Sequence, residues 1–318
     1  MTGELEFILK TAQSFIRRRK LAPAETLLLD EYKKWAKHPL INLVLGEIFF
    51  LKDNVATSLQ YLKIAYEHGK NISSVVVSYA EKLRLNYEAT RAKEVLQLAI
   101  LNSPCDKVLL ESYANFCLTD QNPLESLKFN SRLLLLFPND SMGHTNIAEA
   151  YAALDNYEKS LEHQNIAIKY DTGSQVKLNR AITLLTLNQY QEGWAEYENR
   201  LGDDIISSPR RRLSVPRWNR QPLQDKTILV CSEQGVGDEL YFSSYLPKLI
   251  EISGKVILET DQRLTHLFKE SLGEISVFPY SRRVVYGKPV FNYGWLPKSI
   301  YPDIYNCLIY TSPSPRDS

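Results

Sequence analysis

Residues 146–170, NIAEAYAALDNYEKSLEHQNIAIKY, decide the fold of this chain. Within this stretch Ala148 and Ser160 are small, whereas Tyr151 and Tyr157 are large. Two antiparallel helices joined by a tight turn approach closely only where the facing side chains are small, and bulky neighbours then fill the groove. The stretch therefore predicts two helices packed against each other.

The two small positions recur towards the N-terminus at a constant stride. One register comprises Ala12, Gly46, Ala80, Ala114 and Ala148, and the other comprises Ala24, Ser58, Ala92, Ser126 and Ser160. A looser third register contains Glu31, Ala65, Ala99, Leu133 and Ala167. Because one helix pair cannot bury its apolar face alone, such a repeat predicts that successive pairs stack into a solenoid.

This stride resembles that of the tetratricopeptide repeat family, whose unit spans about 34 residues. Pro104 and Pro138 stand at the position where that family has its closing-turn proline, since proline ends a helix. A sixth copy is out of step, because the step from Tyr157 to Tyr190 is shorter by one than the stride of the registers. The resemblance implies an α-solenoid of about six repeats over residues 1–205 that binds a protein or peptide.

A different composition follows the repeats. Residues 202–225, GDDIISSPRRRLSVPRWNRQPLQD, contain three prolines and five arginines without a helical period. We interpret residues 206–225 as a linker. Its arginines could meet phosphate or an acidic partner, but a solvated connector whose Trp218 packs into the next domain explains the same residues.

Residues 226–306 then alternate between strand and helix patterns. Strands are expected at 227–231, 255–260 and 275–278, and helices at 239–252 and 262–271. This alternation predicts the opening of a parallel doubly wound sheet, in which ligands bind at the carboxyl ends of the strands. We therefore expect a partial Rossmann-like α/β domain after the solenoid.

The turn after the first expected strand carries Gly235, Gly237 and Asp238. Glycines permit a tight turn and a close approach to a ligand, and the following helix start offers free N–H groups. The run does not match the dinucleotide fingerprint, because Leu240 stands in place of its third glycine, and it lacks the Lys of a Walker A loop. Asp238 could simply cap the helix.

The run Trp218–Leu249 resembles the entry to the glycosyltransferase-like domain of bacterial repeat-containing proteins. These are relatives of the heptosyltransferases and the O-linked N-acetylglucosamine transferase, which have two facing Rossmann-like domains (the GT-B fold). The matching residues are Trp218, Glu233, Gln234, Gly235, Gly237, Asp238, Tyr245, Leu246 and Pro247. The resemblance implies that Asp238 is the catalytic base for an acceptor hydroxyl and that Glu233, Gln234, Gly235 and Gly237 bind substrate.

The last residues, 307–318, read CLIYTSPSPRDS and show no periodicity. They resemble the conceptual translation of a sequencing adapter, so we expect an artefactual or disordered tail on a truncated chain. Residues 226–306 would then be the first half of a GT-B fold. On this interpretation the parent protein takes a nucleotide-sugar donor, whereas the fragment itself has no cofactor and is inactive.

Composition excludes several classes of function. Lys and Arg number 38 against 37 Asp and Glu, so no net charge favours nucleic acid or an anionic membrane. No apolar run is long enough for a membrane span, and the N-terminus lacks a secretory signal. The four cysteines form no CxxC pair and the five histidines show no metal-ligand spacing. We therefore expect a cytoplasmic protein that holds no metal.

Two functions remain at this stage. In the first, the solenoid is an interaction scaffold attached to a truncated glycosyltransferase-like domain, whose parent transfers a sugar from a nucleotide sugar to a protein or glycan acceptor. In the second, the protein is a non-enzymatic peptide-binding scaffold or adaptor, and the α/β part has no catalytic role. Whether the chain is an enzyme stays open from the sequence.

Overall fold

The computed structural model describes residues 3–201, 216–219, 221–232, 235–273, 275–280, 282–285, 288–291 and 307–311. The chain divides into two compact units, residues 1–172 with 186–188 and residues 173–185 with 189–318. This division falls one helix pair before the linker that the sequence predicts.

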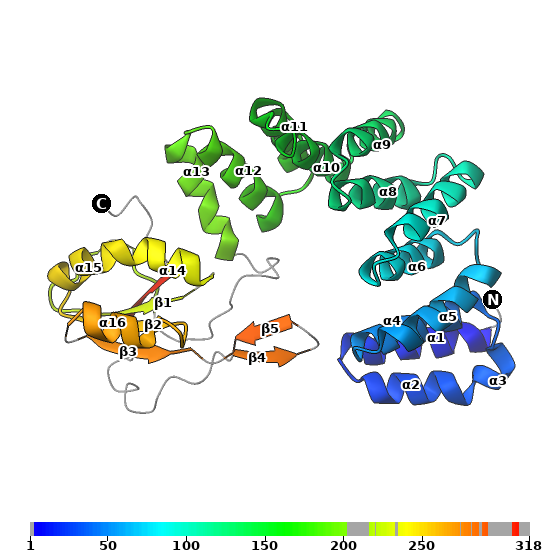
Figure 1. Cartoon of the computed structure of the whole chain (residues 1–318), viewed down its shortest axis with the longest axis horizontal. Coiled ribbons are helices and arrows are strands. Elements are labelled where there is room, and N and C mark those ends of the chain that lie inside the picture. Colours follow the sequence, from blue (N-terminus) through cyan, green and yellow to red (C-terminus); the bar gives the residue numbers. More distant parts are fainter. Residues whose placement is uncertain are drawn as a thin grey trace. The chain divides into compact units, whose positions relative to one another are not determined.

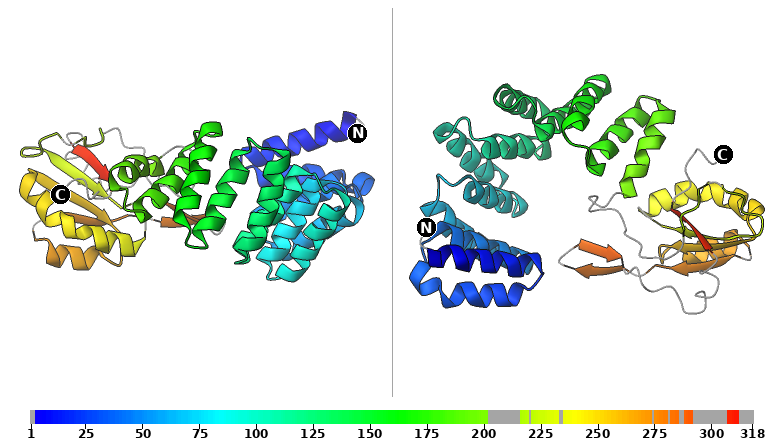
Figure 2. Two further views of the ribbon diagram at one scale, coloured as in Figure 1. Left: turned by 90° about the horizontal axis from the view of Figure 1, so that it is seen from above. Right: turned by 180° about the vertical axis from the view of Figure 1, so that it is seen from behind.

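Unit 1 is built from consecutive antiparallel helix pairs (Figures 1 and 2). The pairs are α1 (Gly3–Arg17) with α2 (Leu21–Asp30), α4 (Pro39–Leu51) with α5 (Val55–His68), α6 (Ser73–Leu85) with α7 (Ala89–Asn102), α8 (Lys107–Thr119) with α9 (Pro123–Leu136), and α10 (Ser141–Ala152) with α11 (Tyr157–Tyr170). The short helix α3 (Tyr32–Trp35) lies between the first two pairs. Successive pairs also contact each other, so the pairs stack as the sequence predicts.

The small residues of the two registers hold each pair together. All ten of them are buried, which confirms the prediction from their constant stride. Gly46 and Ser58 show why size matters, because the Ser58 hydroxyl donates to the Gly46 carbonyl oxygen at 2.7 Å across the α4–α5 contact. A larger side chain at either position would hold the two backbones apart.

The turns inside the pairs follow the same stride. A single non-glycine residue with positive φ stands in each: Arg19, Asp53, Tyr87, Gln121, Asp155 and Asn188. The spacing is constant from Arg19 to Asp155, and the last step, to Asn188, is shorter by one, which matches the offset of the sixth copy. The left-handed residue reverses the chain, and in three pairs the next residue is an asparagine that caps the second helix (Asn54, Asn122, Asn156).

Unit 2 contains the sixth helix pair, α12 (Ser174–Thr186) and α13 (Tyr190–Tyr197), followed by the 3₁₀ turn η1 (Glu198–Leu201). A parallel sheet follows, with β1 (Thr227–Cys231), β2 (Lys255–Thr260), β3 (Ser276–Pro279) and β6 (Cys307–Thr311). The strand order is β3-β2-β1-β6, and every neighbouring pair is parallel. A separate antiparallel hairpin comprises β4 (Arg282–Val285) and β5 (Lys288–Phe291).

The helices between these strands cover one face of the sheet (Figure 1). They are α14 (Val236–Phe242), the turn η2 (Ser243–Tyr245), α15 (Leu246–Ile252) and α16 (Thr265–Ser271). The sequence predicts a single helix over 239–252, but the chain breaks at η2. Pro247 explains the break, because its missing N–H suits the first turn of a new helix and not a helix interior.

Two sequence expectations concern the flanks of this sheet. Trp218 packs against the core of unit 2 and Leu223 is buried within it, as expected for Trp218. Arg217 pairs with Glu198 at 2.6 Å, whereas Arg210, Arg211, Arg212 and Arg220 lie outside the described residues. Residues 307–311, which the sequence analysis assigns to an artefactual or disordered tail, form the strand β6 and pair in parallel with β1.

Candidate functional site

The residues that the sequence singles out lie where β1 passes into α14. Gly235 is the N-cap of α14, and Gly237 and Asp238 lie in its first turn. Glu233 and Gln234 fall outside the described residues. The turn therefore stands at the carboxyl end of β1, which is the edge at which parallel α/β sheets bind ligands.

Asp238 has an exposed side chain that contacts its own helix start. Its Oδ2 accepts a hydrogen bond from the Gly235 N–H at 3.3 Å. This is the helix-capping contact that the sequence analysis offers as the alternative to a catalytic role. It places the negative carboxylate near the N-terminus of a helix, where the helix dipole stabilises it. The capping bond uses one oxygen of the carboxylate, so the other oxygen could still accept from a substrate hydroxyl.

The two glycines of this turn are not required by packing. A Cβ added at Gly237 would meet no atom within 4 Å, and one added at Gly235 would meet only the Asp238 Oδ2 at 3.8 Å. Neither residue has the positive φ that favours glycine. Among the described residues, nothing therefore crowds the Cβ positions of these two glycines.

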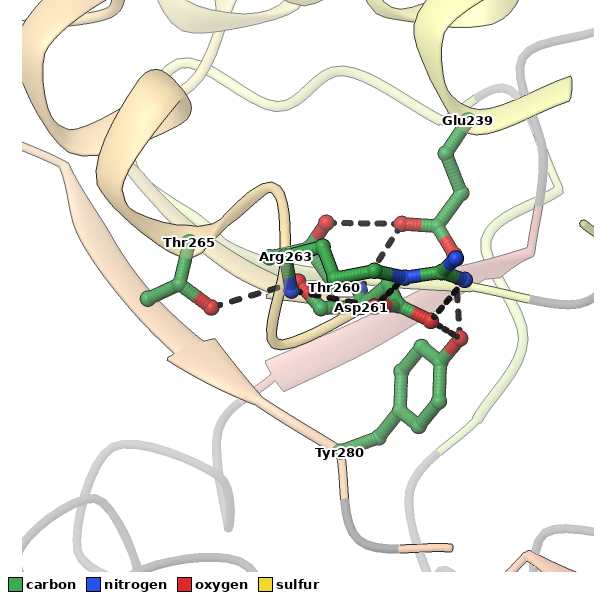
Figure 3. Close-up of polar contacts among 6 residues, drawn as sticks. All are labelled: Glu239, Thr260, Asp261, Arg263, Thr265 and Tyr280. Atoms are coloured by element: carbon green, nitrogen blue, oxygen red, sulfur yellow. Dashed lines mark hydrogen bonds and ion pairs between the residues drawn. The ribbon is translucent and has the colours of Figure 1, made fainter. Parts of the chain in front are cut away.

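A polar cluster lies beside this turn, at the same edge of the sheet (Figure 3). Its centre is Asp261, which directly follows β2 and is 6% exposed. The Asp261 carboxylate accepts from the Arg263 Nε at 2.9 Å, the Arg263 Nη2 at 3.1 Å and the Tyr280 hydroxyl at 2.8 Å. These hydrogen bonds, those from Arg263 first, hold the pKa of Asp261 well below its usual range although burial opposes them.

Glu239 links the cluster to α14. Its carboxylate accepts from the Thr260 hydroxyl at 2.6 Å, from the Asp261 N–H at 2.9 Å and from the Tyr280 hydroxyl at 3.3 Å. The cluster thus joins α14, the end of β2 and the end of β3, and it fixes the helix that carries Asp238. Sequence reasoning missed it, although polar residues directly after the buried run of β2 were its signal.

A second candidate site lies in unit 1. A cleft of about 100 Å³ opens between α6 and α8, two first helices of successive pairs. Its apolar lining comes from Val77, Ala80, Leu96 and Phe116, and its polar lining comes from Glu81, Arg84, Ser112, Asn115 and Thr119. The registers of small residues did not reveal this cleft, because only Ala80 of the lining belongs to a register and its small size already explains the contact within its own pair.

Lys82 is the most buried cation beside this cleft, with 5% of its side chain exposed. Its Nζ lies 2.8 Å from a Glu81 oxygen, 3.5 Å from a Glu47 oxygen and 4.4 Å from the centre of the Phe50 ring. A buried ammonium needs such partners, because desolvation alone would be costly. Glu81 and Glu47 therefore share the single positive charge of Lys82.

Comparison with known proteins supports the helical architecture. No family model matches the chain. A tetratricopeptide repeat protein from Parabacteroides merdae has a TM-score of 0.51 at 16% identity, over 61% of this chain and 78% of that one. PilW, a type IV pilus biogenesis factor, has a TM-score of 0.55 at 12% identity, over 65% and 96%. The chain has a tetratricopeptide-repeat-like fold. At these identities the likeness shows the fold alone.

A curated relative extends the comparison. Protein FlbA of Caulobacter vibrioides is 29% identical over 214 residues, which are 65% of this chain and 36% of that protein. The tetratricopeptide-like chain therefore spans little more than a third of the relative's length.

In the part of the chain that the structure describes, no helix is long and apolar enough to cross a membrane, and no three His, Cys, Asp or Glu side chains gather to hold a metal.

Proposed function

We propose that this protein is a tetratricopeptide-type interaction scaffold that binds an extended segment of another protein in the α6–α8 cleft. The observation that supports this proposal is the lining of the cleft, which combines an apolar floor with a polar rim across two successive helix pairs. A groove of this composition suits a peptide, whose side chains seek the floor and whose backbone needs hydrogen-bond partners at the rim.

Selection of random displayed peptides on the full chain tests this proposal. Asn115→Trp fills the cleft from its exposed rim, and Glu94→Trp places the same ring on the exposed surface of α7 as a matched control. Enriched peptides should bind the unmodified chain and the Glu94→Trp variant, but not the Asn115→Trp variant. Peptides that bind all three proteins equally would place the binding surface elsewhere and contradict the proposal.

A second candidate is sugar transfer by the complete protein, from a nucleotide sugar to a protein or glycan acceptor. The strand order supports it. Strands β2 and β3 lie on one side of β1 and β6 lies on the other, so the order of the strands reverses at β1. Parallel sheets bind ligands at the carboxyl ends of the strands where such a reversal occurs. In this proposal a Rossmann-like half of a GT-B fold holds Asp238 as the base, with Glu233, Gln234, Gly235 and Gly237 against the substrate.

Two assays on the longest natural form of the protein test the second candidate. One measures the binding of uridine diphosphate, and the other measures the transfer of a sugar from a nucleotide sugar to an acceptor. Asp238→Ala should abolish transfer and leave thermal unfolding unchanged within about 1 kcal/mol, the usual size of a capping contact. Asp225→Ala removes an exposed carboxylate just before β1 and serves as the control. Full turnover by Asp238→Ala would remove the catalytic assignment. The cytoplasmic location and the lack of nucleic-acid binding stay predictions.

A further inference from the structure

Three hydrogen-bond donors line the α6–α8 cleft without a partner among the residues that the structure describes. They are the Arg84 guanidinium, the Ser112 hydroxyl and the Asn115 amide. One repeat earlier the pattern is different, since Ser78, which is equivalent to Ser112, donates to Glu47 on the preceding pair. The donors at the cleft therefore have capacity for a ligand that carries several acceptor oxygens.

The carboxylates near the cleft do not satisfy Arg84. Glu81 is engaged with Lys82 at 2.8 Å, and Lys82 also lies 3.5 Å from Glu47. The repeat stride places Glu47, Glu81 and Asn115 at equivalent positions, so α8 presents an amide where the two preceding pairs present an acid. Arg84 thus has no acidic partner among the described residues, although the lining as a whole, with Glu81, is neutral.

The floor of the cleft decides what kind of anion it can take. Val77, Ala80, Leu96 and Phe116 form an apolar surface next to Arg84. A volume of about 100 Å³ is several times what a single water molecule needs, so a side chain can enter it. Inorganic anions would leave this floor unused, and the single free guanidinium offers them no second cation.

We infer that the cleft binds an extended acidic peptide in which an internal Asp or Glu stands next to an aliphatic residue. The carboxylate pairs with Arg84, the aliphatic side chain lies on the floor, and Ser112 and Asn115 donate to carbonyl oxygens of the peptide backbone. This inference rests on the proposed scaffold function and specifies the chemistry of its partner.

Fluorescence anisotropy with two labelled hexapeptides tests the inference on the full chain at low salt. Both peptides have blocked ends and one leucine, and the neighbouring residue is glutamate in one and glutamine in the other. The glutamate peptide should bind about fivefold more tightly, the effect of a partly exposed ion pair. Salt at about 0.5 M should remove most of that difference.

Two variants locate the effect. Arg84→Gln should abolish the preference for glutamate. Arg18→Gln replaces an exposed arginine in the turn between α1 and α2 and should retain the preference. Asn115→Glu restores the carboxylate of the preceding repeats and should weaken binding of the glutamate peptide about fivefold. Since both cleft substitutions lie on partly or fully exposed side chains, circular dichroism should show an unchanged helix content.

Three results would overturn the inference. The first is equal binding of the two peptides, and the second is a glutamate preference that survives Arg84→Gln. The third is tighter binding of a glutamine peptide with a free C-terminal carboxylate, which would assign Arg84 to a chain end. Each leaves the scaffold proposal intact, provided that displayed peptides still lose binding in the Asn115→Trp variant.

Discussion

The Nδ1 atoms of His144 and His163 lie 3.0 Å apart between α10 and α11. The Nε2 of His144 is 3.2 Å from the carbonyl oxygen of Pro138. Because a carbonyl can only accept, the contact with Pro138 requires a proton on Nε2 of His144, and when that ring is neutral its Nδ1 accepts a hydrogen bond from the Nδ1–H of His163. The contact suits two neutral rings, and two charged rings would repel each other at this distance.

The first prediction is a fall in stability on mild acidification. Burial, and then the neighbouring His144, lower the pKa of His163 below its ordinary value. The unfolded chain therefore gains this proton first, near about pH 6.5, and the free energy of unfolding decreases as the pH falls from there towards the folded pKa. Urea midpoints at pH 7.5 and 5.5 measure the effect.

In His163→Gln the glutamine keeps an N–H donor for His144 but does not titrate. The stability of this variant should therefore depend less on pH. His68→Gln, at an exposed histidine of α5, should keep it in full. A pH dependence that is the same in all three proteins would show that the histidine pair does not contribute.

The second prediction concerns the turn residue Tyr87, which has φ = 63° and is 98% exposed. A residue with a Cβ costs about 1–2 kcal/mol in the left-handed region, and this cost exceeds the extra chain entropy of glycine. Tyr87→Gly should therefore raise the free energy of unfolding by about 1 kcal/mol. Glu94→Gly, within the exposed face of α7, should lower it by about the same amount. Thermal unfolding compares the two variants, and a loss of stability in Tyr87→Gly would refute the strain argument.

The third prediction tests the close contact of α4 with α5. A Cβ at Gly46 would lie 2.5 Å from Cγ and 2.8 Å from Cδ2 of Leu62. Overpacking of this kind costs about 1–3 kcal/mol, which exceeds the gain of at most about 1 kcal/mol in helix propensity. Gly46→Ala should thus destabilise the protein by about 1–2 kcal/mol in urea.

The Leu62→Ala background provides the control for this prediction. Once the leucine side chain is removed, Gly46→Ala should cost clearly less, since only the contact of the new Cβ with the Ser58 carbonyl oxygen at 3.3 Å then opposes the gain in helix propensity. If Gly46→Ala costs the same in both backgrounds, the contact with Leu62 is not the cause.

The fourth prediction addresses the polar cluster of unit 2. Tyr280→Phe removes the donor that serves Asp261 at 2.8 Å and Glu239 at 3.3 Å, and should cost about 1–2 kcal/mol. Hydrogen exchange should become faster in β2 and α14 and stay unchanged in unit 1. Tyr241→Phe is the matched control, because Tyr241 is 72% exposed. Equal exchange in both variants would mean that the cluster does not hold α14.

The helical pairs could be predicted from sequence because their contacts repeat. Ala80 and Ala92 are close in the chain, and the same requirement for small size returns at the same two positions of each pair, so repetition alone excludes chance. Strands β1 and β2 were found at the predicted residues because buried parallel strands are continuous apolar runs. The break between α14 and α15 was missed, although Pro247 was its local signal.

The sequence by itself determined the period of this protein, the pairing of its helices and the place of the glycine turn before Asp238. Only the tertiary structure decided which polar side chains meet. Arg84 and Asn115 line one cleft, the Nδ1 atoms of His144 and His163 lie 3.0 Å apart, and Tyr280 joins two carboxylates, although no periodic signal links any of these pairs. The physical reason is that burial of small and apolar residues follows the local repeat, whereas polar partners are selected by distance and by unsatisfied hydrogen-bonding capacity after the elements have packed.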